Sequence, residues 1–194
     1  MSLQEIGFRM KNKYNRINLL QCHHINTVKY QYLKMGSNIS DIEDFCDFKR
    51  VSIRTQHPNY NVWLPKWINI DMKDAIEILP NIINKYDVLI ANAIDSSMAI
   101  KRGNIAVLEN CIIVEIAYGE GTVDKVNHEG VIDKRWITTK AFYNKDIDDE
   151  DILDVFLDIL KLPYINVIIE FSCFSVPVGI FNKKYVAWDI VDWK

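Results

Sequence analysis

The chain has 194 residues, 49% hydrophobic and 25% charged, with a formal net charge of −3, which suits one sizeable domain or two small lobes that share a core. No stretch approaches eighteen uncharged apolar residues and no signal peptide opens the chain, which excludes a membrane-spanning protein and predicts a cytoplasmic one. Four scattered cysteines without a C-x-x-C spacing exclude a disulfide scaffold and give no support to a structural zinc site.

The N-terminal segment, residues 1–48, is basic. Between Ile6 and Met35 it holds six lysines and arginines and no acidic residue. A helix is expected somewhere within 13–35, and "GSNISD" then breaks the pattern. We expect the remainder, 49–194, to form one compact domain, which begins with the short strand "KRVSIRT" at 49–55 and the polar turn "QHPNYN".

A helix is predicted over residues 71–86, followed by a strand over 86–94. The apolar residues of "DMKDAIEILPNIINKY" recur at the spacing of one helix face, and Asp71 is a candidate N-cap. Pro80 is expected to kink or interrupt this helix, because proline lacks the N–H that a helix interior needs. The strand "YDVLIANAI" then ends in a turn near Asp95.

The sequence pattern of the second half of the chain predicts a meander of strands, then one strong helix and two further strands. "DIDDEDILDVFLDILK", residues 146–161, has one apolar face, and acids crowd its first turn, where the helix dipole favours them. Strands outnumber helices and the order is mixed, so the predicted class is α+β. The expected strands are 104–109, 111–119, 121–127, 130–140, 165–174 and 184–193.

Four apolar strands each carry a single charged residue: Arg54 in "VSIRT", Glu115 in "IIVEIA", Glu170 in "VIIEFS" and Asp189 in "YVAWDIV". Burying a charge is costly unless the charge is paired or bound to a metal. One interpretation is structural, with the four residues paired to each other or facing solvent. The other is functional, with two carboxylates holding Mg²⁺ while the arginine binds a phosphate through its planar fork.

The familiar short motifs for nucleotide and hydrolase sites are absent. "YGEG" lacks the third glycine and the following helix of a dinucleotide fingerprint, and a hairpin turn is its simpler interpretation. No G-K-[ST], H-E-x-x-H or G-x-S-x-G occurs, which removes the P-loop and the simplest metalloprotease and serine-hydrolase hypotheses. Cys22, His23 and His24 stay as candidate metal ligands, although neighbouring side chains rarely point at one ion, and either histidine is also a candidate general base or phospho-acceptor.

The order of these segments resembles the ATP-grasp nucleotide-binding domain, in particular that of phosphoenolpyruvate synthase and pyruvate phosphate dikinase. "VSIRT" is similar to a family strand V-x-V-R-S-S, whose arginine contacts ATP phosphates, and this implies a phosphate contact for Arg54. "VEIAYGEG" is similar to a strand and hairpin of the form "IEAxxGLGE", which implies that Glu115 lines the nucleotide cleft. "LDILKLPYINVIIEFS" looks like the segment that ends in "DIEW", which places Glu170 at the Mg²⁺ position.

The resemblance implies ATP and Mg²⁺ as cofactors, with Glu170 and Asp189 as metal ligands. Lys101 and Arg102 are further candidate phosphate contacts. Arg54 and Lys101 are the candidate catalytic residues. The chain also departs from the family. Nothing in residues 1–48 corresponds to its N-terminal glycine-lysine-glycine element, and we do not expect the family's phosphohistidine domain to follow.

Two functional hypotheses follow. The first is an ATP-dependent ligase or phosphotransferase that activates a carboxylate or phosphorylates a partner, either as a stand-alone lobe or with a protein partner or a second copy of itself. The second is a non-catalytic binding or assembly module that keeps the fold and uses its basic segment or an exposed sheet edge. A nucleic-acid partner is the less favoured version of the second hypothesis, because basic stretches such as 1–48 are more often solvated faces. A membrane partner is not expected.

Overall fold

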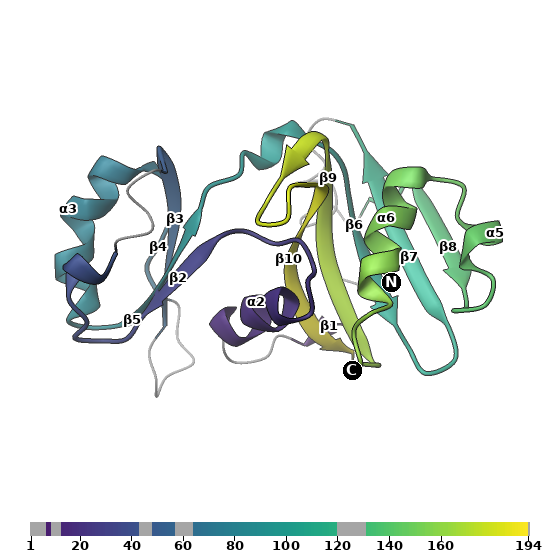
Figure 1. The fold of residues 1–194 in the computed structure, drawn as a ribbon, viewed down its shortest axis with the longest axis horizontal. Helices are drawn as coiled ribbons and strands as arrows, with labels where there is room; N and C mark the ends of the chain where they lie inside the picture. The colour runs from purple at the N-terminus through teal and green to yellow at the C-terminus, as the bar shows by residue number, and fades with distance from the viewer. Residues whose placement is uncertain (1–6, 9–12, 43–47, 57–63, 120–130, 194) are drawn as a thin grey trace. The chain divides into compact units, whose positions relative to one another are not determined.

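The structure is a computed structural model that describes residues 7–8, 13–42, 48–56, 64–119 and 131–193. The chain divides into two compact units (Figure 1). Residues 28–95 form one unit, here called the middle unit, and residues 1–27 with 96–194 form the other, here called the terminal unit. The units therefore change at 27/28 and 95/96, whereas the sequence analysis expected a boundary at 48/49. The turn "QHPNYN" and the strand expected at 121–127 fall largely or wholly outside the described residues.

The middle unit is a four-stranded antiparallel sheet with one helix packed on it. The sheet order is β2-β5-β3-β4. Alternate residues of β3, including Val51 and Ile53, are fully buried against Ala75 and Leu79 of the helix. The elements are β2 (Tyr30–Leu33), the short 3-10 helix η1 (Ile39–Asp41), β3 (Arg50–Gln56), β4 (Lys66–Asp71), α3 (Met72–Ile83) and β5 (Asp87–Asn92).

Helix α3 confirms the helix expected over residues 71–86, with one difference at Pro80. The helix is assigned without interruption through Pro80 to Ile83. The apolar spacing explains this, because Ala75, Leu79 and Ile82 bury one face against the sheet, and that burial favours the helix on both sides of the proline. Asp71 occupies the N-cap position, but its side chain makes no capping hydrogen bond.

The terminal unit is built on a six-stranded antiparallel sheet in the order β1-β10-β9-β6-β7-β8. The strands expected around 104–109, 111–119, 130–140, 165–174 and 184–193 are all present, and the α+β class is confirmed. The strands are β1 (Gly7–Phe8), β6 (Ala99–Val107), β7 (Ile112–Tyr118), β8 (Lys134–Thr138), β9 (Val167–Val178) and β10 (Lys183–Trp193); the helices are α2 (Lys13–Cys22), the 3-10 turn η3 (Ser96–Met98), α5 (Tyr143–Asp146) and α6 (Glu150–Ile159).

One face of this larger sheet, here called the helix face, packs against α6. Ile105 of β6, Val114 of β7 and Ile169 of β9 are fully buried in one cluster with Val155 and Phe156 of α6. Because successive side chains of a strand point to opposite sides, the residues between them belong to the other face, here called the polar face. Glu115 and Glu170 occupy such intermediate positions.

Helix α6 confirms the strongest helix prediction. Asp149 is its N-cap, and the side chain accepts a hydrogen bond from the backbone N–H of Ile152 at 3.3 Å. Glu150 and Asp151 occupy the first turn, as the dipole argument requires. The helix expected within 13–35 is shorter than that range, because α2 ends at Cys22 and β2 follows at Tyr30. In the part of the chain that the structure describes, no helix is long and apolar enough to cross a membrane.

Candidate functional site

A row of polar residues crosses five strands on the polar face of the larger sheet. From β10 to β8 the row is Asp189, Glu170, Asn104, Glu115 and Arg135, and each residue is the register partner of the next. Partners in an antiparallel pair project from the same side of the sheet, with Cβ atoms about 5 Å apart. Three of the four charged strand residues singled out in the sequence therefore come from strands far apart in the chain and lie in one line.

Arg102 stands beside this row, two residues before Asn104 on β6. Its register partners are Ser172 of β9 and Ala117 of β7. Arg102 is 8% exposed and Ser172 is fully buried, and the indole N–H of Trp188 donates to the Ser172 hydroxyl oxygen at 2.7 Å. A guanidinium thus lies on the same face as the carboxylates, and the phosphate contact expected of Arg102 stays a prediction.

Glu115 is paired with a cation from the neighbouring strand. The guanidinium of Arg135 donates to the Glu115 carboxylate. Glu115 is almost completely buried, with a side-chain exposure of 3%, whereas the Arg135 side chain is 46% exposed. The Glu115 charge is therefore compensated within the sheet, as the structural interpretation of these residues required.

Asp189 is held by two cations of helix α2. Its Oδ2 atom lies 2.7 Å from the Lys13 ammonium and 3.2 Å from Nη1 of Arg16. Oδ1 accepts the backbone N–H of Ile190 at 3.0 Å, and the Lys13 ammonium also donates to the carbonyl of Trp188 at 2.6 Å. The carboxylate is 4% exposed, so these contacts are made away from solvent.

The polar row fits a magnesium ion bound by Glu170 alone, but not one shared by Glu170 and Asp189. Mg²⁺ takes one or two carboxylates together with phosphate oxygens and water. Glu170 is half-buried on the polar face and fits the one-carboxylate arrangement. A shared ion between Glu170 and Asp189 does not fit, because the Asp189 carboxylate already binds Lys13 and Arg16. Among the described residues, no group of three or more His, Cys, Asp or Glu side chains is placed to hold a metal, and this includes His23 and His24.

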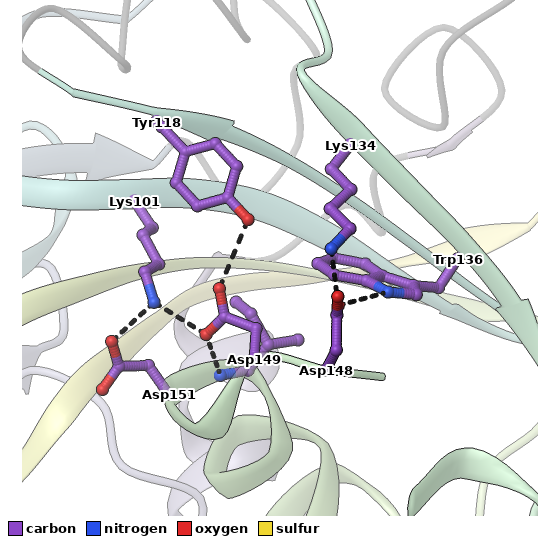
Figure 2. A network of polar contacts seen from close by, with 8 residues as sticks. Lys101, Tyr118, Lys134, Trp136, Asp148, Asp149 and Asp151 are labelled. Carbon is purple, nitrogen blue, oxygen red and sulfur yellow. Dashed lines mark hydrogen bonds and ion pairs between the residues drawn. The ribbon is translucent and has the colours of Figure 1, made fainter. Parts of the chain in front are cut away.

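Lys101 lies on the helix face, opposite its neighbour Arg102. Its ammonium binds Asp149 at 2.7 Å and Asp151 at 2.6 Å, and the Tyr118 hydroxyl reaches Asp149 at 3.3 Å (Figure 2). Burial by itself lowers the pKa of Lys101, but the hydrogen bonds and charges of the two aspartates outweigh it and hold that pKa above 10.5. Lys101 joins β6 to the start of α6 and shares no face with Glu170.

A second lysine repeats this arrangement on β8. Lys134 binds Asp148 at 2.5 Å, and the same carboxylate oxygen accepts the indole N–H of Trp136 at 3.2 Å (Figure 2). The hydrogen bond from Lys134 lowers the pKa of Asp148 below 3.8. Asp148 and Asp149, which precede α6, are therefore bound by lysines of the sheet. The sequence analysis explained these acids by the helix dipole alone and did not predict their lysine partners.

Arg54 belongs to the middle unit. It is exposed on β3, where its register partners are Lys66 and Leu89. The neighbouring residues Ile53 and Val51 face α3, so Arg54 projects from the opposite face of its sheet. Its predicted contact with phosphates stays a prediction.

Sequence reasoning missed four residues of this region, namely Asn104, Arg135, Lys13 and Arg16. Asn104 is 3% exposed in the middle of an apolar strand, which is the same signal that identified Glu170. No local signal marks the other three. Lys13 and Arg16 meet their partner more than 170 residues further along the chain, and only the packing of α2 against β10 brings them together.

Comparisons with known proteins identify the fold but not the family. No family model matches the sequence, and no curated protein matches it. Solved structures do match. The D-alanine-D-alanine ligase of Helicobacter pylori superposes with a TM-score of 0.52 at 10% identity over 93% of this chain. The L-amino acid ligase of Bacillus licheniformis superposes with a TM-score of 0.52 at 8% identity, also over 93%.

The present chain is much shorter than these ligases. It covers 50% of the first protein and 42% of the second, so it spans about half the length of the structures it matches. At such low identity the similarity is one of fold. The two mostly antiparallel sheets with few helices are the arrangement of the ATP-grasp ligases, and the ATP-grasp-like fold that the sequence predicted is confirmed.

Proposed function

We propose that this protein binds ATP and uses it to activate a carboxylate or to phosphorylate a partner. The observation that carries the proposal is the polar row, with Arg102 beside it, on the polar face of an ATP-grasp-like sheet. A guanidinium and a carboxylate on one face supply the two things that a bound triphosphate needs, namely a fork for phosphate oxygens and a ligand for its metal.

Within this proposal, Arg102 binds phosphate oxygens and Glu170 is the protein ligand of Mg²⁺. The ion supplies positive charge to the phosphate oxygens, which stabilises the charge that develops when a phosphoryl group is transferred. The phosphate contact predicted for Arg54, which belongs to the middle unit, is kept as a separate proposal. Glu115 forms part of the wall of the site, where its pairing with Arg135 keeps a buried charge neutralised.

Ligase chemistry is preferred to phosphotransferase chemistry as the working hypothesis. The superposed structures named above are ligases, and this supports carboxylate activation, although they extend well beyond the present chain. The finer likeness to phosphoenolpyruvate synthase rests on the short segments "VSIRT" and "VEIAYGEG" alone. It remains part of the proposal rather than a finding.

The experiment that tests nucleotide binding is a thermal-shift and calorimetric titration with ATP, with and without millimolar Mg²⁺. Ligand at one hundred times its dissociation constant adds about 2.7 kcal/mol to the free energy of unfolding. Arg102→Met and Glu170→Gln are expected to remove the shift, and Lys140→Met, an exposed lysine outside the polar face, is the control. No response of the unmodified protein to any nucleotide overturns the proposal.

A non-catalytic module is the second candidate, because two of the charges expected in a catalytic site are satisfied internally. Glu115 is bound by Arg135, and Asp189 by Lys13 and Arg16. The pairing also removes Lys13 and Arg16 from the set of cations that a nucleic acid could contact. ATP binding without release of ADP or phosphate, across a panel of carboxylate and amine substrates, favours this second function over the first.

A further inference from the structure

Helix α2 brings two positive charges to a carboxylate in the wall of the proposed site. Lys13 is 21% exposed and Arg16 is 7% exposed, and both bind the same oxygen of Asp189. The helix is fixed in this position by Ile17 and Leu20, which are buried at 3% and 0% exposure. The ion pairs are thus part of the packed interior, and they account for two of the six cations of the basic N-terminal segment.

The three groups together carry one surplus positive charge next to Glu170. Asp189 and Glu170 are register partners on β10 and β9, with Cβ atoms about 5 Å apart. Two carboxylates at this spacing would ordinarily suit a divalent ion held between them. Here the Oδ2 atom of Asp189 is ion-paired with Lys13 and Arg16, and its Oδ1 atom accepts the Ile190 N–H.

We propose that Lys13 and Arg16 take the place of a metal ion at Asp189. The helix supplies, as covalently attached side chains, the positive charge that a second cation would otherwise bring to this end of the polar row. The site then takes no more than one divalent ion, at Glu170. This inference rests on the proposed function for the Glu170 ion, and it deepens that function by fixing the number and position of the metals.

The physical reason is that ammonium and guanidinium groups repel a divalent ion at short range in a site away from solvent. A metal that bound Asp189 would have to displace both cations into that site or expel them to water. Each would then lose its partner while still partly buried, which is the costly state for an ion pair. Asp189 therefore acts as a positioning residue that holds α2 and its charges, not as a metal ligand.

The test is a Mn²⁺ titration followed by electron paramagnetic resonance, without nucleotide. In the unmodified protein we expect no more than one bound ion, lost in Glu170→Gln. The double variant Lys13→Met/Arg16→Met frees the Asp189 carboxylate, so we expect it to bind Mn²⁺ at least tenfold more tightly. Adding Asp189→Asn to the double variant should reverse this gain.

The matched control is Lys29→Met/Lys34→Met, which removes the same charge from the same N-terminal segment and should leave Mn²⁺ binding unchanged. A folded Lys13→Met/Arg16→Met variant that gains nothing overturns the inference. If the double variant does not fold, the single variant Lys13→Met, which removes the shorter of the two ion pairs, should still bind Mn²⁺ more tightly than the unmodified protein, and no gain there overturns the inference. Because no nucleotide is used, a failed ATP titration and a failed Mn²⁺ titration are separate results.

Discussion

Lys101 of β6 binds Asp149, the N-cap of α6, at 2.7 Å. This contact helps to hold the start of the helix against the sheet, on the face opposite Glu170. The lysine that the sequence analysis had offered to a phosphate is thus bound to two aspartates at the start of a helix (Figure 2). We assign it a structural role, and that assignment can be tested directly.

Lys101→Met is expected to lower the free energy of unfolding by about 2 kcal/mol, because Asp149 and Asp151 lose a charged donor in a mostly buried place. Nucleotide affinity should not change. Urea unfolding measures the first quantity and calorimetry the second, with exposed Lys140→Met as the reference. If Lys101→Met keeps its stability but no longer binds ATP, the structural role is wrong and Lys101 contacts the nucleotide.

The environment of Asp158 predicts that the stability of the fold depends on pH in the acidic range. Burial raises the pKa of this carboxyl, but hydrogen bonds from Lys161, Lys183 and Tyr185 outweigh it and bring the pKa below 3.8. A lowered pKa stabilises the fold fully above the unfolded value near 3.8, and the contribution disappears as pH falls through the lowered pKa.

The measurement is the difference in unfolding free energy between the unmodified protein and Asp158→Asn. We expect a difference of about 2 kcal/mol, chiefly because the buried Tyr185 hydroxyl loses a charged acceptor. The ion pairs with Lys161 and Lys183 add little to it, because these side chains are 61% and 37% exposed and water screens their charges. The difference should be constant from pH 5 to 8 and shrink only below pH 3.8. A difference that already shrinks between pH 7 and 5 would contradict this assignment.

Gly103→Ala is expected to destabilise the larger sheet by about 1–3 kcal/mol, the usual cost of an overfilled core. An added Cβ would collide with the backbone carbonyl of Glu115 and lie 2.8 Å from Cγ2 of Ile116. Gly36→Ala is the comparison, because nothing lies within 4 Å there and only its positive φ of 83° is strained, at about 1 kcal/mol. Equal losses at the two glycines, measured by chemical denaturation, would mean that β6 and β7 can separate to accept the methyl group.

Asn26→Ala is expected to be among the most damaging polar substitutions, at about 3 kcal/mol or more. The Asn26 amide donates to the carbonyl of Val178 at 2.8 Å, and its oxygen accepts the Phe181 N–H at 2.8 Å, with Asn26 fully buried. Its removal leaves these groups without their partner away from water. Hydrogen exchange at the Phe181 amide should accelerate well beyond the change seen at Val114, and uniform acceleration would point to global unfolding instead.

The elements of this protein could be predicted from sequence because hydrophobic period is a local property. The spacing of Ile152, Val155 and Phe156 identified α6, and the single charges in apolar strands identified Glu115, Glu170 and Asp189. The partners of these charges could not be predicted. Strand order and register place Arg135 against Glu115, and the packing of α2 places Lys13 against Asp189, across separations that no local pattern encodes.

The start of β6 also differs from the prediction. The expected strand began at residue 104, whereas β6 begins at Ala99, so Lys101 and Arg102 are adjacent in a strand and their side chains point to opposite faces. Arg102 shares a face with Asn104, and Lys101 does not. The domain boundary was harder, because residues 28–48 join the middle unit through the pairing of β2 with β5, which a basic composition does not indicate.

The connection between Asn26 and the β9–β10 hairpin has a consequence for biosynthesis. The middle unit is contiguous in sequence, from Val28 to Asp95, so every strand of its sheet has been synthesised once Asp95 is added. The terminal unit is not contiguous: α2 and Asn26 must wait for Val178, Tyr185 and Asp189 before their partners exist. Chains are translated at about 5–20 residues per second, so the early helix spends several seconds exposed while the middle unit folds first.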